Sequence, residues 1–422
     1  MNSNWNQIGI SPADILLPRP EYRENFCVVA CDQFTSEPAY WEETESIVGS
    51  GYSALRLIYP EIYLNERPEE RINEINRNMR EYLEQGVFQE YSNSIIYVER
   101  TLMDGRLRKG LVLAVDLEKY DYSPQSSSLI RATEGTIESR LPARIRIRRN
   151  APLELPHIML LIDDREQTVI EPLAEEDLTP VYDMPLMQNG GRVKGFLLDE
   201  ENQERVFNAL SALASPDKQQ AKYSLKEPAP LLLYAVGDGN HSLASAKSYW
   251  EGLKKTISPE EAKNHPARYA LVELVNLHDS SLVFEPIHRV LFNVQPEKIL
   301  KALEERCGFA SEGQGVETVF NGQSRFVHFA RPAHQLSVGT LQKFLDGVLE
   351  ESAGARLDYI HEEETVRDLA AREGNMGFIL SPMSKNELFK AVILAGPLPR
   401  KTFSMGSGRD KRYYLEARRI KP

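Results

Sequence analysis

The sequence predicts a protein of the α+β (mixed α/β) class, and three features of the 422-residue chain indicate it. Apolar runs such as residues 231–236 and 268–277 have the length and composition of buried strands. Residues 67–88 repeat apolar side chains three or four positions apart, as an amphipathic helix does. From residue 295 onward helical and strand patterns alternate, which is typical of an α/β unit. We therefore expect one domain over 1–294 and a smaller α/β domain over 295–422.

The elements of the first domain are expected in this order: strand 26–31, helix 37–48, helix 67–88, hairpin 94–120, strands 157–164 and 192–199, helix 201–215, and strands 231–236, 268–277 and 282–292. Thr35 or Ser36 is suited to cap the helix over 37–48, and Gly86 to end the next one. Cys27 and Cys31 lack a second ligand pair at zinc spacing, so we interpret them as buried thiols.

In the second domain we expect helices over 297–309, 340–352, 362–374 and 386–396, and strands over 324–330, 357–361 and 376–381. Ser384 and Glu387 have the spacing of a capping box at the start of the last helix. The basic, glycine-containing loop over 399–412, with Arg400 and Lys401, follows this helix. It is expected either to return to an anion site or to lie on the surface.

The composition of the chain argues against several classes of protein. With 62 acidic and 50 basic residues the formal net charge is −12, so we expect no nucleic-acid partner. No apolar run is long enough to span a bilayer, and the N-terminus lacks the pattern of a secretory signal. Three cysteines are too few for a disulfide framework and fit a reducing cytoplasm.

The strand over 231–236 ends in a short polar segment that leads into a helix. The segment reads Gly237, Asp238, Gly239, Asn240, His241 and Ser242. Glycines allow the backbone to turn sharply and approach a ligand, and the start of a helix attracts anions such as phosphate. Asp238 is suited to hold a metal ion, and His241 to contact phosphate or move a proton. The alternative is a structural turn, in which Asp238 caps the helix and His241 packs.

Two basic segments are further candidates. In 286–289, His288 and Arg289 alternate on a strand, so one of them can face a site while the other packs. In 140–149, Arg140 and Arg144 would share a helical face, whereas a strand would group Arg144 with the arginines at 146 and 148. Such clusters are suited to bind phosphate, and a solvated or salt-bridged surface is the alternative in each case.

Taken together, these motifs resemble a widespread bacterial and archaeal family of conserved proteins without an assigned function. Its pattern is a strand ending in Asp-Gly-His-His-Arg, then Pro-x-His-Arg, then a terminal Pro-Arg-Lys-Ser/Thr. Residues 238–242, 286–289 and 399–402 match in the same order, across nearly the whole chain. Glu134 matches part of a His-Glu-x-Thr group, and Asp32 the end of a Pro-Tyr-Asp group. The sequence departs from the main motif because Asn240 and Ser242 replace its first His and its Arg.

The first motif is also similar to the phosphate-binding element of the ParB/sulfiredoxin-like fold, which includes partition proteins and free-serine kinases. This resemblance implies such a fold for the N-terminal region, a nucleotide (ATP or ADP), Mg²⁺ and phosphoryl transfer to a small hydroxyl-bearing metabolite. The expected catalytic residues are Asp238, His241, His288 and Arg289. The expected nucleotide-binding residues are Gly237, Gly239, Asn240, Ser242, Glu134, Arg140, Arg144 and Lys401, and the expected metal ligands are Asp32 and Asp238. The alternatives are a non-catalytic protein that binds a nucleotide or phosphometabolite, and a metal-dependent phosphohydrolase.

Overall fold

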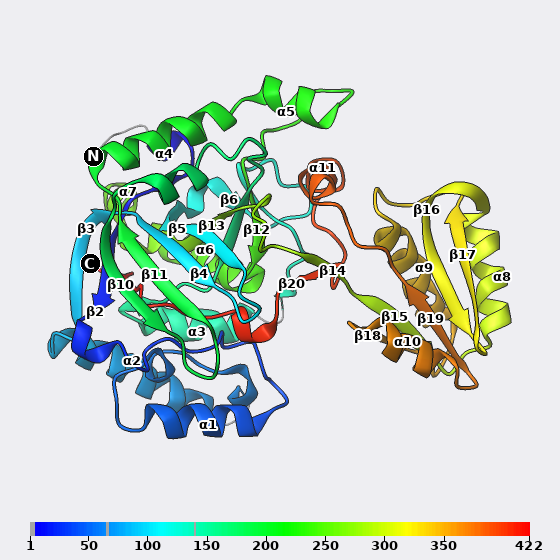
Figure 1. Ribbon diagram of the computed structural model, residues 1–422, viewed down its shortest axis with the longest axis horizontal. Helices are drawn as coiled ribbons and strands as arrows, with labels where there is room; N and C mark the ends of the chain where they lie inside the picture. Colours follow the sequence, from blue (N-terminus) through cyan, green and yellow to red (C-terminus); the bar gives the residue numbers. More distant parts are fainter. Residues whose placement is uncertain (1–4, 65–66, 139–140) are drawn as a thin grey trace. The chain divides into compact units, whose positions relative to one another are not determined.

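The computed structural model describes residues 5–64, 67–138 and 141–422, which form two compact units (Figure 1). The first unit comprises the described residues up to 132, then 136–282 and 406–422; the second comprises 133–135 and 283–405. These divisions fall at different residues from the expected 1–294 and 295–422. The reason is that the strands after residue 282 pair within the second unit.

A ten-stranded mixed sheet forms the centre of the first unit. Its strands are β1 (Ile10–Ser11), β4 (Ile96–Thr101), β5 (Leu107–Asp116), β6 (Tyr120–Asp121), β7 (Ile130–Ala132), β9 (Met159–Ile162), β10 (Thr179–Pro185), β11 (Arg192–Leu197), β12 (Tyr234–Asp238) and β13 (Tyr269–Asn276). The order is β10-β11-β4-β5-β13-β9-β12-β7-β6, and β1 pairs with β5. Strand β9 is parallel to β13 but antiparallel to β12, so the start of β9 lies beside the end of β12.

The remaining elements of this unit surround the sheet. Two small antiparallel pairs join β2 (Ala13–Pro18) to β3 (Phe88–Ser94) and β8 (Leu153–Glu154) to β21 (Arg418–Arg419). The helices are α1 (Pro38–Val48), α2 (Pro68–Glu84), α3 (Leu141–Asn150), α4 (Glu200–Leu213), α5 (Pro216–Tyr223), α6 (Asn240–Lys254) and α7 (Pro259–Asn264). Short 3-10 helices are η1 (Trp5–Gln7), η2 (Pro20–Tyr22), η3 (Ala54–Arg56), η4 (Glu61–Tyr63), η5 (Leu117–Lys119), η7 (Glu171–Glu175), η8 (Pro266–Arg268) and η9 (Gly408–Asp410).

Alternating side chains give this sheet two buried faces. In β5, Leu111 and Leu113 belong to one apolar cluster and Val112 to the other, because successive strand residues point to opposite faces. The cluster that contains Leu111 includes side chains of α4 and α6, and the cluster that contains Val112 includes side chains of α1 and α2. Helices therefore cover both faces, with α4 and α1 on opposite sides of the strands in Figure 1.

Two predictions for the first unit are wrong. Residues 26–31 are mostly buried but form no regular strand; Val29 alone makes an isolated bridge, to Arg412. Their burial comes from packing against the C-terminal segment. Helix α1 begins at Pro38, which favours the first helical position, so its N-cap is Glu37 rather than Thr35 or Ser36.

The second unit contains a five-stranded antiparallel sheet in the order β17-β16-β19-β15-β18. The strands of this sheet are β15 (His288–Phe292), β16 (Phe309–Phe320), β17 (Gln323–Phe329), β18 (Arg356–Ile360) and β19 (Asn375–Ile379). Two further strands, β14 (Phe284–Pro286) and β20 (Phe403–Met405), form a separate pair. The helices of the unit are α8 (Pro296–Cys307), α9 (Ser337–Glu351), α10 (Glu363–Ala370) and α11 (Lys385–Ala395). The strand expected over 282–292 is two strands, because β14 pairs with β20 while β15 joins the larger sheet. Strand β16 was not expected, since most of its first half is exposed and lacks apolar alternation.

The mixed α/β class is confirmed in both units, and so is the Ser384–Glu387 capping box of α11. In the second unit, Val366 and Ala370 of α10 pack on sheet residues that include Val290 and Val319. Among the described helices, not one combines the length and apolarity needed to cross a bilayer.

Acid should destabilise the first unit through Asp163, which follows β9 and is 8% exposed. Its carboxylate lies 2.6 Å from His278 Nε2, 2.5 Å from the Tyr223 hydroxyl and 2.8 Å from Lys222 Nζ. Burial raises the pKa of Asp163, but these three partners outweigh it and lower the pKa to about 2. Because the folded-state pKa lies below the unfolded value, this carboxylate stabilises the fold above about pH 4 and loses that effect toward pH 2.

We expect this loss to be roughly 2 kcal/mol of unfolding free energy between about pH 5 and pH 2. Urea unfolding at a series of pH values measures it. Asp163→Asn should flatten the pH dependence by that amount, and an unchanged dependence in this variant would contradict the assignment.

Candidate functional site

The predicted strand–turn–helix junction is present between β12 and α6. Strand β12 ends at Asp238 and α6 begins at Asn240. Gly239, between them, has a φ of 76°, and a Cβ there would lie 3.0 Å from Cα of Ile158. Both backbone conformation and space therefore require glycine at this position. The first-turn amides of a helix have no acceptor within the helix, and the helix dipole adds positive potential there, so this end of α6 favours an anion.

Asp238 is held by contacts to both of its carboxylate oxygens. Oδ1 accepts a hydrogen bond from the Gly239 amide at 2.8 Å, and Oδ2 lies 3.1 Å from Lys411 Nζ. Both side chains of this ion pair are about one-quarter exposed, at 26% and 25%. The sequence analysis did not name Lys411, although it lies in the loop over 399–412 that was expected to return to the site. Lys411 places a cation beside the first turn of α6.

His157 is the second residue of this site that the sequence analysis missed. It precedes β9, whose antiparallel pairing with β12 brings it to the α6 turn, and its Nε2 lies 2.9 Å from Ser242 Oγ. Burial lowers the pKa of His157; the carboxylates of Asp32 and Asp238 act against this, yet the net shift is downward. The imidazole is therefore neutral at pH 7. A lone histidine at the start of a buried strand was the only signal in the sequence.

Asp32 and Arg144 are the last two residues of this site. The Ala30 amide donates a hydrogen bond to the Lys411 carbonyl at 2.7 Å, which holds the segment bearing Asp32 alongside the C-terminal segment. Burial raises the pKa of Asp32, but His157, the Gln33 side chain, Lys411 and Arg144 outweigh it and lower the pKa. Arg144 lies in α3, which is a helix rather than a strand, and it forms an ion pair with Glu61. We call Asp32, Arg144, His157, Asp238, Ser242 and Lys411 the α6 cluster.

The other predicted residues of this junction do not belong to the α6 cluster. His241 Nε2 accepts a hydrogen bond from the Ile137 amide at 3.2 Å, so the lone pair of that nitrogen is already used. Asn240 is 7% exposed; its Oδ1, like the buried Oγ1 of Thr136, has no hydrogen-bond partner among the described residues. These two atoms depart from the rule that buried polar atoms are hydrogen-bonded. Gly237 lies within β12, and Arg140 lies outside the described residues.

His288 and Arg289 belong to the second unit and are 4% and 0% exposed. His288 Nδ1 accepts a hydrogen bond from the Leu380 amide at 3.1 Å, and burial lowers the pKa of its imidazole. Arg289 donates to the carbonyl of Ile287, and its guanidinium lies 5.2 Å from the centre of the Tyr359 ring. Burial lowers its pKa to about 10, so it stays charged at pH 7. These contacts hold both side chains within the second unit, and a catalytic role for either residue stays a prediction.

Glu134 and Lys401 meet in the second unit. The Lys401 amide donates a hydrogen bond to Glu134 Oε1 at 3.1 Å, and Lys401 has a φ of 58°. The neighbouring Leu398 amide donates to the Thr133 carbonyl at 2.7 Å, which fixes the segment 133–135 against the loop over 399–402. A single site that combines these residues with the α6 cluster stays a prediction.

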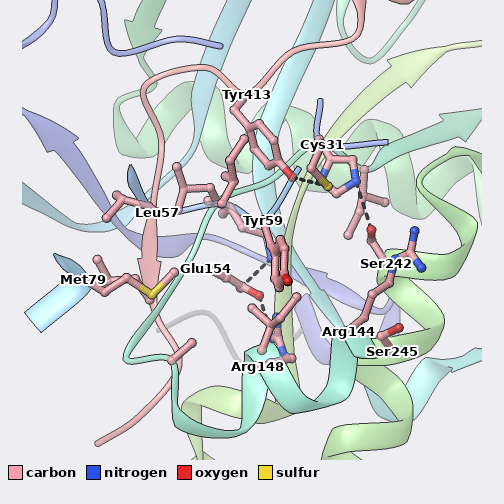
Figure 2. A pocket seen from close by; sticks show the side chains of 18 of the residues that line it. Cys31, Leu57, Tyr59, Met79, Arg144, Arg148, Glu154, Ser242, Ser245 and Tyr413 are labelled. Carbon is pink, nitrogen blue, oxygen red and sulfur yellow. Dashed lines mark hydrogen bonds and ion pairs between the residues drawn. The ribbon is translucent and has the colours of Figure 1, made fainter. Parts of the chain in front are cut away.

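A cavity of about 150 Å³ adjoins the α6 cluster (Figure 2). Arg144, His157 and Ser242 of the cluster line it, together with aliphatic side chains such as Leu57 and Met79. Figure 2 also shows the Tyr413 hydroxyl directed at Cys31 Sγ, which lies 3.1 Å away. Burial raises the pKa of the Cys31 thiol to about 12, so it stays protonated at pH 7. Cys27 is a buried thiol, as predicted, whereas Cys31 is only partly buried.

The described ranges contain no group of three or more His, Cys, Asp or Glu side chains that could hold a metal ion. Asp238 is already engaged by Gly239 and Lys411. These residues therefore do not form a closed metal site, and Mg²⁺ binding at Asp32 and Asp238 stays a prediction.

The fold and the α6 cluster define a mixed α/β protein with a polar site at a strand–helix junction. The chain belongs to the family described as protein of unknown function (DUF1015), which matches residues 10–417. The resemblance noted from the motifs likewise implied a family without an assigned function. No curated protein matches the chain significantly.

Three solved structures are distantly similar. A free serine kinase mutant in complex with AMP is 12% identical, with 74% of this chain and 91% of that chain covered and a TM-score of 0.39. A conserved hypothetical protein from Pyrococcus furiosus is 10% identical, covers 74% and 95%, and has a TM-score of 0.35. SbnI from Staphylococcus aureus, truncated at its C-terminus, is 14% identical, covers 70% and 83%, and has a TM-score of 0.34. TM-scores below 0.5 indicate only a distant likeness, which does not establish a shared function.

Proposed function

We propose that the protein is a nucleotide-dependent phosphotransferase that transfers a phosphoryl group to the hydroxyl of a small metabolite. The observation that supports it is the α6 cluster, which brings two cations, two carboxylates and a neutral imidazole to the start of a helix. Phosphoryl transfer depends mainly on positioning and charge stabilisation, which such a set supplies. The proposal includes a ParB/sulfiredoxin-like fold for the region that bears the motif, and a cytoplasmic location.

In this mechanism the nucleotide phosphates lie over the first-turn amides of α6, and Lys411 stabilises their charge. Lys411 thereby supplies the positive charge that the family motif places on an arginine at the position of Ser242. His157 accepts the proton of the acceptor hydroxyl, and the nearby Asp32 carboxylate stabilises the imidazolium that forms. The acceptor oxygen bonds to the terminal phosphorus, the bond from that phosphorus to the bridging oxygen breaks, and the nucleoside diphosphate leaves with the electron pair.

Nucleotide binding tests this proposal. We expect ATP or ADP at about one hundred times its dissociation constant to stabilise the folded chain by roughly 2.7 kcal/mol, measured as a higher thermal unfolding midpoint. Adenosine, which lacks phosphates, is the matched control and should give a much smaller shift. No shift with either nucleotide at millimolar concentration would contradict the proposal. A shift without phosphoryl transfer to any of a panel of alcohols would instead favour a nucleotide-binding regulatory protein.

The hydrogen bond between Ser242 and His157 favours a second candidate, a hydrolase with Ser242 as nucleophile, because an adjacent imidazole can activate a serine hydroxyl. A fluorophosphonate probe distinguishes the two. Covalent labelling of Ser242 would support the hydrolase, whereas an unlabelled serine together with nucleotide binding would support the phosphotransferase.

A further inference from the structure

The cavity beside the α6 cluster has mostly apolar walls. Helix α3 contributes Ile147, the core contributes Leu57 and Leu271, and α2 contributes Met79 (Figure 2). Its volume of about 150 Å³ matches that of apolar protein cavities that accept a ring the size of benzene. The walls and the volume together suit a compact apolar group.

Charges at the cavity wall are paired with one another. Arg144 forms an ion pair with Glu61, and Arg148 Nη2 lies 2.6 Å from Glu154 Oε2. Each of these four charged lining residues therefore already has an oppositely charged partner. A charged ligand body would lose its hydration here without gaining a free counter-ion, so the cavity favours an uncharged one.

The polar end of the cavity coincides with the proposed reaction centre. Ser242 and His157 both line the pocket and belong to the α6 cluster, and Ser242 Oγ lies 2.9 Å from His157 Nε2. A hydroxyl at this end would meet the imidazole that accepts its proton, while the rest of the molecule contacts the apolar wall.

We propose, on the basis of the phosphotransferase function above, that this cavity is the acceptor site and that it selects a small alcohol with a compact, uncharged, apolar body. Such an acceptor has roughly six to eight non-hydrogen atoms, the size that a cavity of this volume admits. The cavity thus determines the substrate class, and the α6 cluster performs the transfer.

Variants at Ser245 and Ile147 test this inference. Ser245 is 3% exposed, lines the cavity, and bonds only within its own helix, to the His241 carbonyl at 2.7 Å. Ser245→Leu fills the cavity, and Ser245→Ala is its control because it removes only the hydroxyl. Ile147→Trp fills the cavity from α3, where the side chain is only partly buried, so it offers a second variant if Ser245→Leu does not fold.

The probes are benzyl alcohol and choline, an alcohol of similar size whose body carries a positive charge, titrated without nucleotide and followed by ligand-observed NMR. We expect saturable binding of benzyl alcohol that is at least tenfold weaker in Ser245→Leu and Ile147→Trp but unchanged in Ser245→Ala. Choline should bind the natural chain at least tenfold more weakly than benzyl alcohol does. Equal affinity for the two probes, or undiminished alcohol binding in both filled variants, would overturn the inference.

Nucleotide binding, measured in parallel, separates the two proposals. ATP binding without saturable alcohol binding would overturn the acceptor site and leave the proposed function standing. Alcohol binding without ATP binding would sustain the apolar alcohol site but overturn its role in phosphoryl transfer.

Discussion

Asp238→Asn should lower the rate of ATP-dependent phosphoryl transfer by about 100-fold or more, the range seen when one preorganised electrostatic contact is removed from an active site. The Asp238 carboxylate orients the Lys411 ammonium at 3.1 Å and accepts the Gly239 amide hydrogen bond at 2.8 Å. Asparagine keeps the size and the bond to Gly239 but loses the charge that holds Lys411. Because the pair is about three-quarters buried, we expect some loss of stability, so the rates are compared at equal concentrations of folded protein. Transfer to an alcohol acceptor, followed as nucleoside diphosphate release, measures the effect.

Asp183→Asn is the matched control for this experiment. Asp183 also lies on a strand, β10, and pairs with Arg192 at 2.6 Å, but both side chains are nearly half exposed. This variant should retain the full transfer rate. Retained activity in Asp238→Asn, or a loss accompanied by a matching loss of folded protein, would remove Asp238 from the proposed mechanism.

Glu154→Gln should reduce the free energy of unfolding by about 3–5 kcal/mol, because it leaves buried guanidinium groups without their counter-ion. Glu154 Oε1 accepts bonds from Arg418 Nε and from the Leu271 amide, both at 2.9 Å, and Oε2 lies 2.6 Å from Arg148 Nη2. Burial raises the pKa of Glu154, but Arg418 and Arg148 outweigh it and hold the pKa below its usual range. Urea unfolding at pH 7 measures the change.

The pH dependence of the stability difference between the natural chain and Glu154→Gln tests the same prediction. Since the folded-state pKa of Glu154 is lowered, its carboxylate stabilises the fold above the unfolded pKa and loses this effect as the pH falls through the folded value. The difference between the natural chain and Glu154→Gln should therefore shrink in acid. Glu260→Gln, which disrupts an exposed pair with Lys263, is the control and should unfold like the natural chain. A change below about 1 kcal/mol in Glu154→Gln would show that the buried pair does not carry this stability.

Local patterns predicted much of the fold. The apolar spacing of α2, the hairpin over 94–120 and the Ser384–Glu387 capping box each depend on residues a few positions apart, and each is confirmed. The strand predicted over 26–31 is absent because an apolar run indicates burial but does not specify the hydrogen-bond partner that would make it a strand.

Local sequence patterns predicted only part of the candidate site. Asp238, Ser242 and Asp32 follow from motifs at the ends of apolar segments, and Arg144 from a cluster of basic residues. The local patterns around His157 and Lys411, a lone histidine before a buried strand and a basic loop, do not show that these residues reach the turn. They reach it through the β9–β12 register and through the packing of the C-terminal segment on residues 28–30.

The sequence alone was enough to predict the mixed α/β class and the turn between β12 and α6, since both follow from neighbouring side chains. It was also enough to establish the acidic character of the chain, which follows from composition. Only the folded chain decided that His157 and Lys411 adjoin this turn, that His241 is engaged by a backbone amide, and that an apolar cavity opens beside the cluster. These features join residues far apart in the chain, and their meeting depends on strand register and burial, which no short stretch of sequence specifies.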